Sequence, residues 1–351
     1  MITYFAIFGF LVLIGLSAKS RMGRLVATFF VGTFLLIFMG TRYETGCDYW
    51  GYLVRFNYLY QDENYLSYLP AEEPGFHLLN FAIKSFGLDY VWLNVSASLI
   101  YLICLFRFAR ISPRPLLLIA LFFPILIVQL GMSGLRQALA VGFLLLAFAN
   151  YTEKNRILTA LWILVAAQFH QSAYIFLPLA LLVGRNISVG RIMVALILIG
   201  PVVGYLLEER AQVYHERYVE ELYGENSSSG AIFRYALALI PALLFEKYKV
   251  RLRRVFTKSY DLMRLFSLIT FALIPVGFVS TVALHRLTYY VLPISIYTLL
   301  NVSMVMPRRV GVSKKLLFVP VLIFGAYVVV WFVWSKHASS CYIPYKTYLN
   351  I

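Results

Sequence analysis

The chain has 351 residues, of which 61% are hydrophobic and only 13% charged, and its net charge is +15. A soluble domain carries about 25% charged residues, so this composition excludes an ordinary globular enzyme, and the high apolar fraction excludes a disordered chain. Three cysteines are too few for a disulfide scaffold. A multi-span membrane protein remains, and its apolar segments are helices because they far exceed the roughly 10 residues of a barrel strand.

Apolar windows of about 20 residues, somewhat shorter in places, predict about twelve transmembrane helices and an all-α polytopic fold in a single integral membrane domain, residues 1–351. In chain order the segments are 3–18, 25–39, 90–106, 115–130, 135–150, 157–169, 172–184, 192–207, 231–245, 265–283, 287–306 and 316–335. The first lacks a basic leader and a small-residue cleavage site, so we expect a retained span and not a signal peptide. One long helix could replace the short pair across 157–184.

Charge divides unevenly between the loops of this arrangement. Six alternate loops hold 21 of the 31 Lys and Arg residues but three of the 16 acidic residues: 19–24, 107–114, 151–156, 185–191, 246–264 and 307–315. Basic loops stay in the cytoplasm, so the charge reports topology and contact with anionic lipids, and we expect no nucleic-acid binding. The topology favours a hairpin at Ala167–Ala173, because fusing its two helices would place every later basic loop outside.

Two long segments fall on the other, outer side. Within 40–89, the first outer loop, Pro74-Gly75 opens an apolar run, Phe76 to Phe86, that is too short to span and predicts an interfacial or re-entrant helix. The second outer loop, 208–230, predicts a mobile lid. The cytoplasmic loops hold no glycine-rich phosphate loop, so the energy for any chemistry must come from an activated lipid or an ion gradient.

Several basic residues break the charge bias, and some of them lie at outer helix ends. They are Arg42, Arg55, Arg136, Arg234 and Arg286, with the histidines His170 and His285. Arginine in such a place is costly unless it is paired or lines a wet cavity. It could snorkel to lipid headgroups, or pair with Glu44 or Glu73. The recurrence of these residues favours an anion site, since guanidinium groups bind phosphate bidentately.

Five local motifs carry these residues. They are Gly46-Cys47-Asp48-Tyr49, Glu73-Pro74-Gly75-Phe76, Gly134-Leu135-Arg136-Gln137, Phe169-His170-Gln171-Ser172-Ala173 and His285-Arg286-Leu287-Thr288-Tyr289-Tyr290. The third opens a helix, whose backbone N–H groups add to the attraction of Arg136 for anions. In the fifth, Arg286, Tyr289 and Tyr290 share one helix face by spacing.

The order of the first four motifs, over roughly residues 40–185, resembles Wzy-type O-antigen polymerases and the related EpsG exopolysaccharide proteins. The resemblance implies a GT-C-type membrane glycosyltransferase of the bacterial inner membrane. Such a protein joins glycan repeat units carried on undecaprenyl pyrophosphate, as donor and acceptor, at the periplasmic face. It also leaves room for a separate protein that regulates chain length.

For that reaction we expect Arg136, Arg286, His170 and Asp48 to be catalytic. The arginines would stabilise the pyrophosphate leaving group, and His170 would orient the acceptor hydroxyl, take its proton or donate to phosphate. The residues expected to bind substrate are Arg42, Glu73, Gln137, His285, Tyr289 and Tyr290. Alternatives stay open: Asp48 or Glu73 could be the base, bind sugar or hold an arginine, and His170 could simply be a helix-tip residue bonded to backbone.

Cysteine and metal chemistry is sparse. Cys47 and Cys341 both fall on the outer side, where a disulfide would tether the tail to the first loop; two free buried thiols are the alternative. We expect no cofactor and no metal, although Glu44, Asp48 or Glu73 could hold a divalent ion.

Competing functions are a flippase or transporter of lipid-linked glycans, which would place polar groups near the membrane midplane, and an O-antigen ligase.

Overall fold

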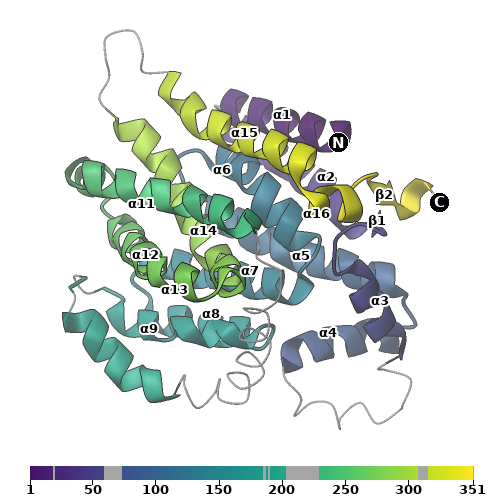
Figure 1. The fold of residues 1–351 in the computed structure, drawn as a ribbon, viewed down its shortest axis with the longest axis horizontal. Helices are drawn as coiled ribbons and strands as arrows, with labels where there is room; N and C mark the ends of the chain where they lie inside the picture. The colour runs from purple at the N-terminus through teal and green to yellow at the C-terminus, as the bar shows by residue number, and fades with distance from the viewer. Residues whose placement is uncertain are drawn as a thin grey trace. The chain divides into compact units, whose positions relative to one another are not determined.

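The computed structural model describes residues 1–18, 20–58, 73–184, 187–188, 190–202, 229–306 and 315–350 (Figure 1). Nearly all regular structure in these ranges is helical. One short antiparallel ladder occurs there, between β1 (Arg42–Tyr43) and β2 (Lys346–Thr347).

The helices of the first half of the chain are, in order, α1 (Ile2–Ser17), α2 (Arg21–Gly40), α3 (Tyr49–Tyr58), α4 (Pro74–Ser85), α5 (Tyr90–Ala109), α6 (Pro115–Phe122), the π-helix η2 (Phe123–Gly131), α7 (Leu135–Thr152) and α8 (Arg156–Ala167). The rest comprises η3 (Gln171–Phe176), α9 (Pro178–Leu182), a helix at Gly190–Val202, α11 (Ser229–Val255), α12 (Tyr260–Ala272), α13 (Ile274–Val279), α14 (Thr281–Val305), η4 (Lys315–Leu317), α15 (Phe318–Trp334), α16 (Lys336–Cys341) and η5 (Tyr348–Asn350).

Among the described residues, five helical stretches are long and apolar enough to cross a membrane: α2, α5, α7, the stretch Tyr260–Phe278 and α14. Six apolar helices in the same ranges are shorter, α1 and α15 among them. The protein is therefore an all-α membrane protein, as its composition predicts. Every predicted segment falls on a helix, or on consecutive helices, over its described residues. The number of spans and the GT-C architecture stay predictions.

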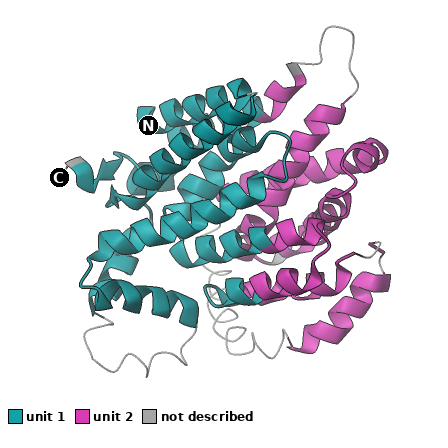
Figure 2. Ribbon diagram, turned by 180° about the vertical axis from the view of Figure 1, so that it is seen from behind, with its two compact units in different colours: residues 1–146, 164–171, 321–351 teal, residues 147–163, 172–320 magenta. Residues whose placement is uncertain are grey.

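The chain forms two compact units (Figure 2). Unit 1 comprises residues 1–146, 164–171 and 321–351, and unit 2 comprises residues 147–163 and 172–320. In unit 1, α1 packs on α6 and α2 packs on α5. In unit 2, α14 packs against α11 and α12, and almost every residue of its second half is buried.

The core of unit 1 is built on α6 and η2, whose side chains are nearly all buried. A π-helix changes the spacing of backbone hydrogen bonds and is frequent at functional sites, and buried carbonyls need partners. Two tyrosines supply them: the Tyr101 hydroxyl donates to the Leu126 carbonyl at 3.0 Å, and the Tyr342 hydroxyl donates to the Gln129 carbonyl at 3.2 Å. These two hydrogen bonds stabilise the π-helix, which ends at Gly131, just before the turn that leads into α7.

The C-terminal tail is fastened to the segment that follows α2. Arg42 pairs with Thr347 in the ladder, and the Thr41 and Thr347 hydroxyls lie 2.7 Å apart. A disulfide joins Cys47 to Cys341. The tether considered from the sequence is therefore present, and the alternative of two free thiols is not.

Some boundaries differ from those expected. We expected a break between 283 and 287, at the charged His285-Arg286, but α14 already begins at Thr281. Ser280 has an extended backbone and its hydroxyl accepts from the Ala283 N–H at 3.2 Å, so it caps the helix. The region 157–184 is not one helix, because α8 ends at Ala167 and η3 begins at Gln171.

The predictions for the two outer segments, 40–89 and 208–230, differ in outcome. The apolar run after Pro74 does form a helix, α4, and residues 49–58 form a further helix, α3, that the sequence analysis left as loop. The predicted lid, 208–230, lies outside the described residues apart from its last two positions.

Candidate active site

Glu73 is the centre of a polar cluster within unit 1. It precedes α4 with a left-handed backbone, φ 64°, and Pro74 follows in the first turn. Its carboxylate is 3% exposed, yet it has two partners: Arg136 donates from Nη1 to Oε2 at 2.6 Å, and Nδ1 of His170 lies 2.5 Å from Oε1. Non-glycine residues in this conformation are strained by about 1–3 kcal/mol, and such strain clusters at functional sites.

A close backbone contact brings the second and fourth motifs together. The Gly75 N–H donates to the Gln168 carbonyl at 2.9 Å, so the start of α4 lies on the end of α8. A Cβ atom at Gly75 would lie 2.9 Å from Cβ of Gln168 and 3.0 Å from its carbonyl oxygen. Only glycine fits without displacement. This contact places the Glu73 carboxylate beside His170.

The charge state of Glu73 follows from its partners. Burial on its own raises the pKa of a carboxyl group, but the hydrogen bonds from His170 and Arg136 and the positive charge of Arg136 outweigh burial and leave the pKa of Glu73 below its ordinary value. Glu73 is therefore ionised at neutral pH. It neutralises Arg136 and fixes the orientation of both partners. For Arg136, the pairing alternative considered from the sequence is the arrangement present.

Three side chains extend the cluster. The Tyr52 hydroxyl of α3 accepts from the Arg136 backbone N–H at 3.4 Å, and burial raises its pKa. His77, one turn into α4, has a lowered pKa because of burial and then of the nearby positive charge of Arg55. The sequence analysis did not single out His77. Its position four residues after Glu73, within the short apolar run that predicts a helix, is the signal that would have found it.

Asp48 directly precedes α3 and contacts the turn between the π-helix η2 and α7. Its exposed carboxylate accepts from the Ser133 hydroxyl at 3.1 Å, and its own N–H donates to Ser133 Oγ at 3.3 Å. Gly46 permits this approach, because its φ is 108° and a Cβ there would lie only 2.0 Å from the Met132 carbonyl oxygen. Asp48 is thus an accessible carboxylate at a helix N-terminus, a favourable place for negative charge. Gln137 is half-buried in the first turn of α7.

Arg42 lies elsewhere in unit 1. Its side chain is 1% exposed and donates from Nη1 to the Met39 carbonyl at 2.5 Å, at the C-terminal end of α2. A cation there complements the helix dipole. Four tyrosines lie within its electrostatic reach, and burial lowers its pKa. Glu44, considered as a partner for an arginine, pairs instead with Lys346.

The remaining predicted residues lie in unit 2. Arg234, on α11, is 8% exposed, donates to the Tyr289 hydroxyl at 3.1 Å and lies 5.1 Å from the centre of the Tyr289 ring. The His285 ring packs against the Tyr289 ring, and the centres of the two rings lie 5.1 Å apart. Tyr290 is buried and its hydroxyl is 2.6 Å from that of Ser172. Arg286 is exposed.

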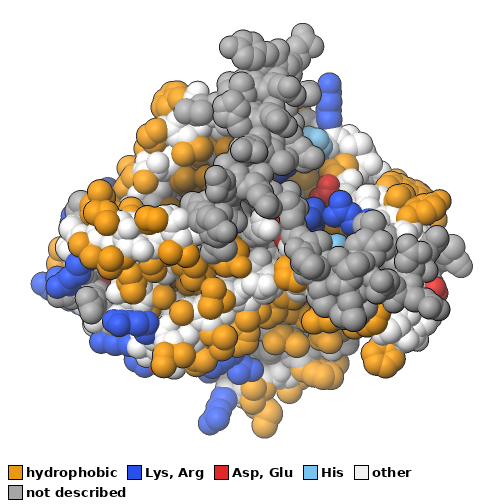
Figure 3. All heavy atoms as spheres, turned by 90° about the horizontal axis from the view of Figure 1, so that it is seen from below, with side chains coloured by type: hydrophobic (Ala, Val, Ile, Leu, Met, Phe, Trp, Pro, Cys, Tyr) orange, Lys and Arg blue, Asp and Glu red, His pale blue; other side chains and the backbone are white. Residues whose placement is uncertain are grey.

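One face of the surface brings charged and histidine side chains together (Figure 3). Figure 3 shows acidic, basic and histidine side chains close together on the face seen from below. Elsewhere on this face hydrophobic side chains are prominent, as expected where a surface meets lipid.

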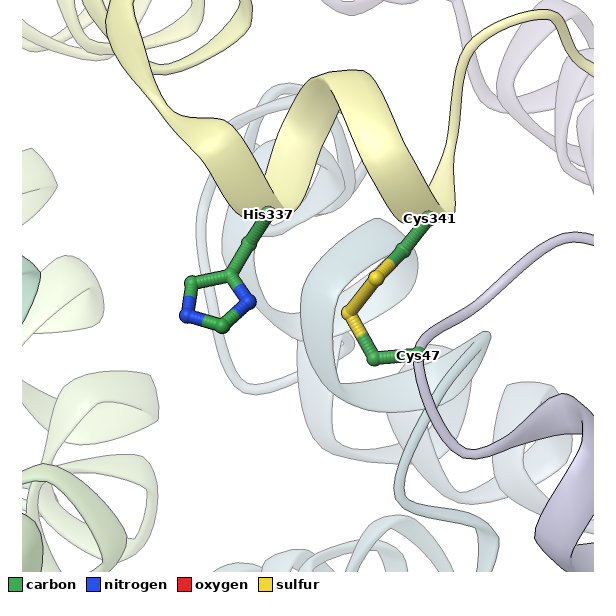
Figure 4. Close-up of side chains that lie close together, drawn as sticks. All are labelled: Cys47, His337 and Cys341. Carbon is green, nitrogen blue, oxygen red and sulfur yellow. A yellow bond between two sulfur atoms is a disulfide. The ribbon is translucent and has the colours of Figure 1, made fainter. Parts of the chain in front are cut away.

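One group of potential metal ligands occurs among the described residues. Cys47, His337 and Cys341 offer ligand atoms within 4.8 Å of one another (Figure 4). Both sulfur atoms are bonded to each other in the disulfide, which removes the thiolates that a metal would need. The group does not fit a metal in this state.

Comparison with known proteins agrees with these motifs. The model of the EpsG family matches residues 25–347. The chain belongs to the EpsG family. The match contains all five motifs and every residue of the Glu73 cluster. Membership supports a role like that of a polysaccharide polymerase in general terms. No curated protein and no solved structure matches the chain.

Proposed function

We propose that this EpsG-family protein is a membrane glycosyltransferase that joins lipid-pyrophosphate-linked glycan repeat units into a polysaccharide at the outer face of the bacterial inner membrane. The observation that carries the proposal is the buried Glu73 carboxylate, which holds a cation and an imidazole together at 2.6 and 2.5 Å. Glycosyl transfer from a pyrophosphate needs both groups: one for the leaving phosphate and one for the attacking hydroxyl.

The reaction exchanges one bond for another. The bond between C1 of the donor sugar and the pyrophosphate oxygen breaks, and its electron pair leaves with the carrier pyrophosphate. The acceptor hydroxyl oxygen forms the new bond to C1 and releases its proton. Negative charge therefore develops on phosphate while a proton is set free, and fixed groups that meet both changes lower the barrier.

We assign His170 as the general base that takes the proton released by the acceptor hydroxyl. Its Nδ1 is held by Glu73, so Nε2 is the nitrogen that serves the acceptor hydroxyl. A carboxylate behind an imidazole fixes its tautomer and stabilises the imidazolium formed when it takes a proton. Asp48, accessible and bonded to Ser133, is the second candidate base.

We assign Arg136 as the group that stabilises the negative charge on the leaving pyrophosphate. Glu73 engages one nitrogen of a guanidinium that carries five N–H donors, and the side chain is 31% exposed, which leaves donors for an anion. At rest, Glu73 cancels the charge of Arg136. When His170 accepts the proton, the trio becomes positive just as the phosphate becomes negative.

Unit 2 has its own group of predicted residues. Exposed Arg286 would contact an anionic part of the carrier, whereas Tyr289 and Tyr290 are buried and would support the first turns of α14 behind it. The sequence analysis counted Arg234 among the basic residues that favour an anion site, but not among the expected catalytic or substrate-binding residues. Arg234 holds Tyr289 in place by a hydrogen bond and a cation–π contact.

The direct test gives the purified protein lipid-linked repeat units alone. A polymerase extends them into a ladder, whereas a ligase or flippase leaves single units. Arg136→Ala and Arg286→Ala should each abolish the ladder while single units persist. Arg254→Ala, at an exposed arginine on α11, is the control and should extend normally. Full-length chains from both site variants would refute the proposed site, and a lack of extension by the wild type would refute the activity.

A further inference from the structure

A surface groove lies between α2 and α5 of unit 1, and none of its lining residues belongs to the Glu73 cluster. It has a volume of about 430 Å³ and a mostly apolar lining. We call it the α2–α5 groove and define it by Phe29, Gly32, Ile103, Phe106, Arg107 and Arg110. Phe29 is 70% exposed and Ile103 is 59% exposed, so the protein itself leaves these side chains uncovered.

A glycine lines the groove. A Cβ atom at Gly32 would lie 3.8 Å from the Phe106 ring, which is ordinary van der Waals contact. A larger side chain there would extend over Phe106. The absence of a side chain at Gly32 therefore adds to the apolar space, which an acyl chain could fill.

One end of the groove is cationic. Arg107 and Arg110 line it, one helical turn apart at the end of α5, and both are exposed. No Asp or Glu occurs in α2 or between Tyr90 and Leu118, so no acidic residue in these segments offsets the charge. Two further arginines, Arg24 and Arg114, line a separate pocket of about 210 Å³ beside the same helix ends.

We propose that the α2–α5 groove binds an anionic phospholipid, with an acyl chain over Phe106 and the phosphate at Arg107 and Arg110. An apolar groove that ends in exposed arginines, with no acidic residue in the two segments that line it, complements a ligand with a hydrocarbon tail and one negative head. Arginine pockets between helices on the cytoplasmic side of a membrane protein suit anionic headgroups, and the charge pattern of the loops predicts that side for 107–114. The inference does not depend on the proposed polymerase activity.

The test measures lipid binding to the purified full-length protein in detergent. Phosphatidylglycerol and phosphatidylcholine with identical acyl chains are titrated, and retained lipid is counted by native mass spectrometry. Phosphatidylglycerol should bind saturably at one site, at least tenfold more tightly than phosphatidylcholine. Since each arginine near a headgroup contributes roughly fivefold, Arg107→Gln with Arg110→Gln should weaken binding about 30-fold.

Matched variants separate this site from general attraction. Arg253→Gln with Arg254→Gln removes two exposed arginines of α11 and should change affinity less than threefold. Gly32→Leu should weaken binding at least tenfold without any change of charge. Gly9→Leu, at an α1 glycine with nothing within 4 Å of its Cβ position, should not.

Four results would overturn the inference. They are equal affinity for the two lipids, equal loss in both double-arginine variants, undiminished binding in Gly32→Leu, and displacement of the lipid by inorganic phosphate, which would reveal an anion site without a lipid. If Gly32→Leu does not fold, the comparison of lipid affinity between the two double-arginine variants still tests the inference.

Discussion

Glu73→Gln tests the central cluster most directly. The substitution keeps the shape and the left-handed backbone but removes the charge that holds Arg136 and His170. A hydrogen bond to a charged group contributes about 1.5–3 kcal/mol, and the Glu73 carboxylate makes two, at 2.6 and 2.5 Å. The contact with Arg136 is discounted because that side chain is 31% exposed. We therefore expect a loss of about 2–4 kcal/mol in the free energy of unfolding.

The effect on activity should be larger than the effect on folding. A mispositioned general base costs about 10²- to 10⁴-fold in rate, so Glu73→Gln should slow extension of lipid-linked units by at least 100-fold at a temperature where the variant is still folded. Glycan ladders measure the rate, and thermal unfolding in detergent measures the stability. Because the assay compares folded protein, a loss of rate cannot arise from unfolding.

The matched control is Glu246→Gln. Glu246 is exposed and pairs with Lys249 three residues on, at 2.9 Å. Exposed pairs contribute about 0–1 kcal/mol, so this variant should keep its stability and its rate. If Glu73→Gln extends glycan within threefold of the wild type, the assignment of His170 and Arg136 as a Glu73-held pair is wrong.

Three further outcomes follow from the same geometry. Gly75→Ala should destabilise the protein by about 1–3 kcal/mol through overpacking against α8, whereas Gly51→Ala, with open space around its Cβ position, should not; equal melting temperatures would contradict the close contact. Cys47→Ser should cost about 2–4 kcal/mol by releasing the tail, and a reductant should then have no further effect on unfolding. The lowered pKa of Glu73 adds stability above the ordinary carboxyl pKa of about 4.3. That stability is lost as pH falls through the folded pKa, so acid unfolding below about pH 4.5 should be less steep in Glu73→Gln than in the wild type.

Much of the architecture is decided by local sequence. Hydropathy is a property of each residue, and a helix within lipid must satisfy its backbone hydrogen bonds internally. A run of apolar residues therefore fixes a helix without reference to the rest of the chain, and the predicted segments match the described helices. The break at Ser280 was missed because capping by a hydroxyl is a weaker signal than a charged pair such as His285-Arg286. Helix α3 was missed because its sequence mixes polar and aromatic residues.

The sequence also indicated which residues are candidates for chemistry, since arginines, carboxylates and histidines stand out against an apolar background in which they cost free energy. What it left open was their partners. Glu73 reaches Arg136 and His170 across separations of 63 and 97 residues, and Cys47 reaches Cys341 across 294. Such pairs depend on how helices pack, and packing is set by shape, as in the contact between Gly75 and the end of α8. Tertiary structure alone therefore decided that Glu73 holds the site together, whereas Arg42, equally conspicuous in the sequence, is buried at the end of a helix.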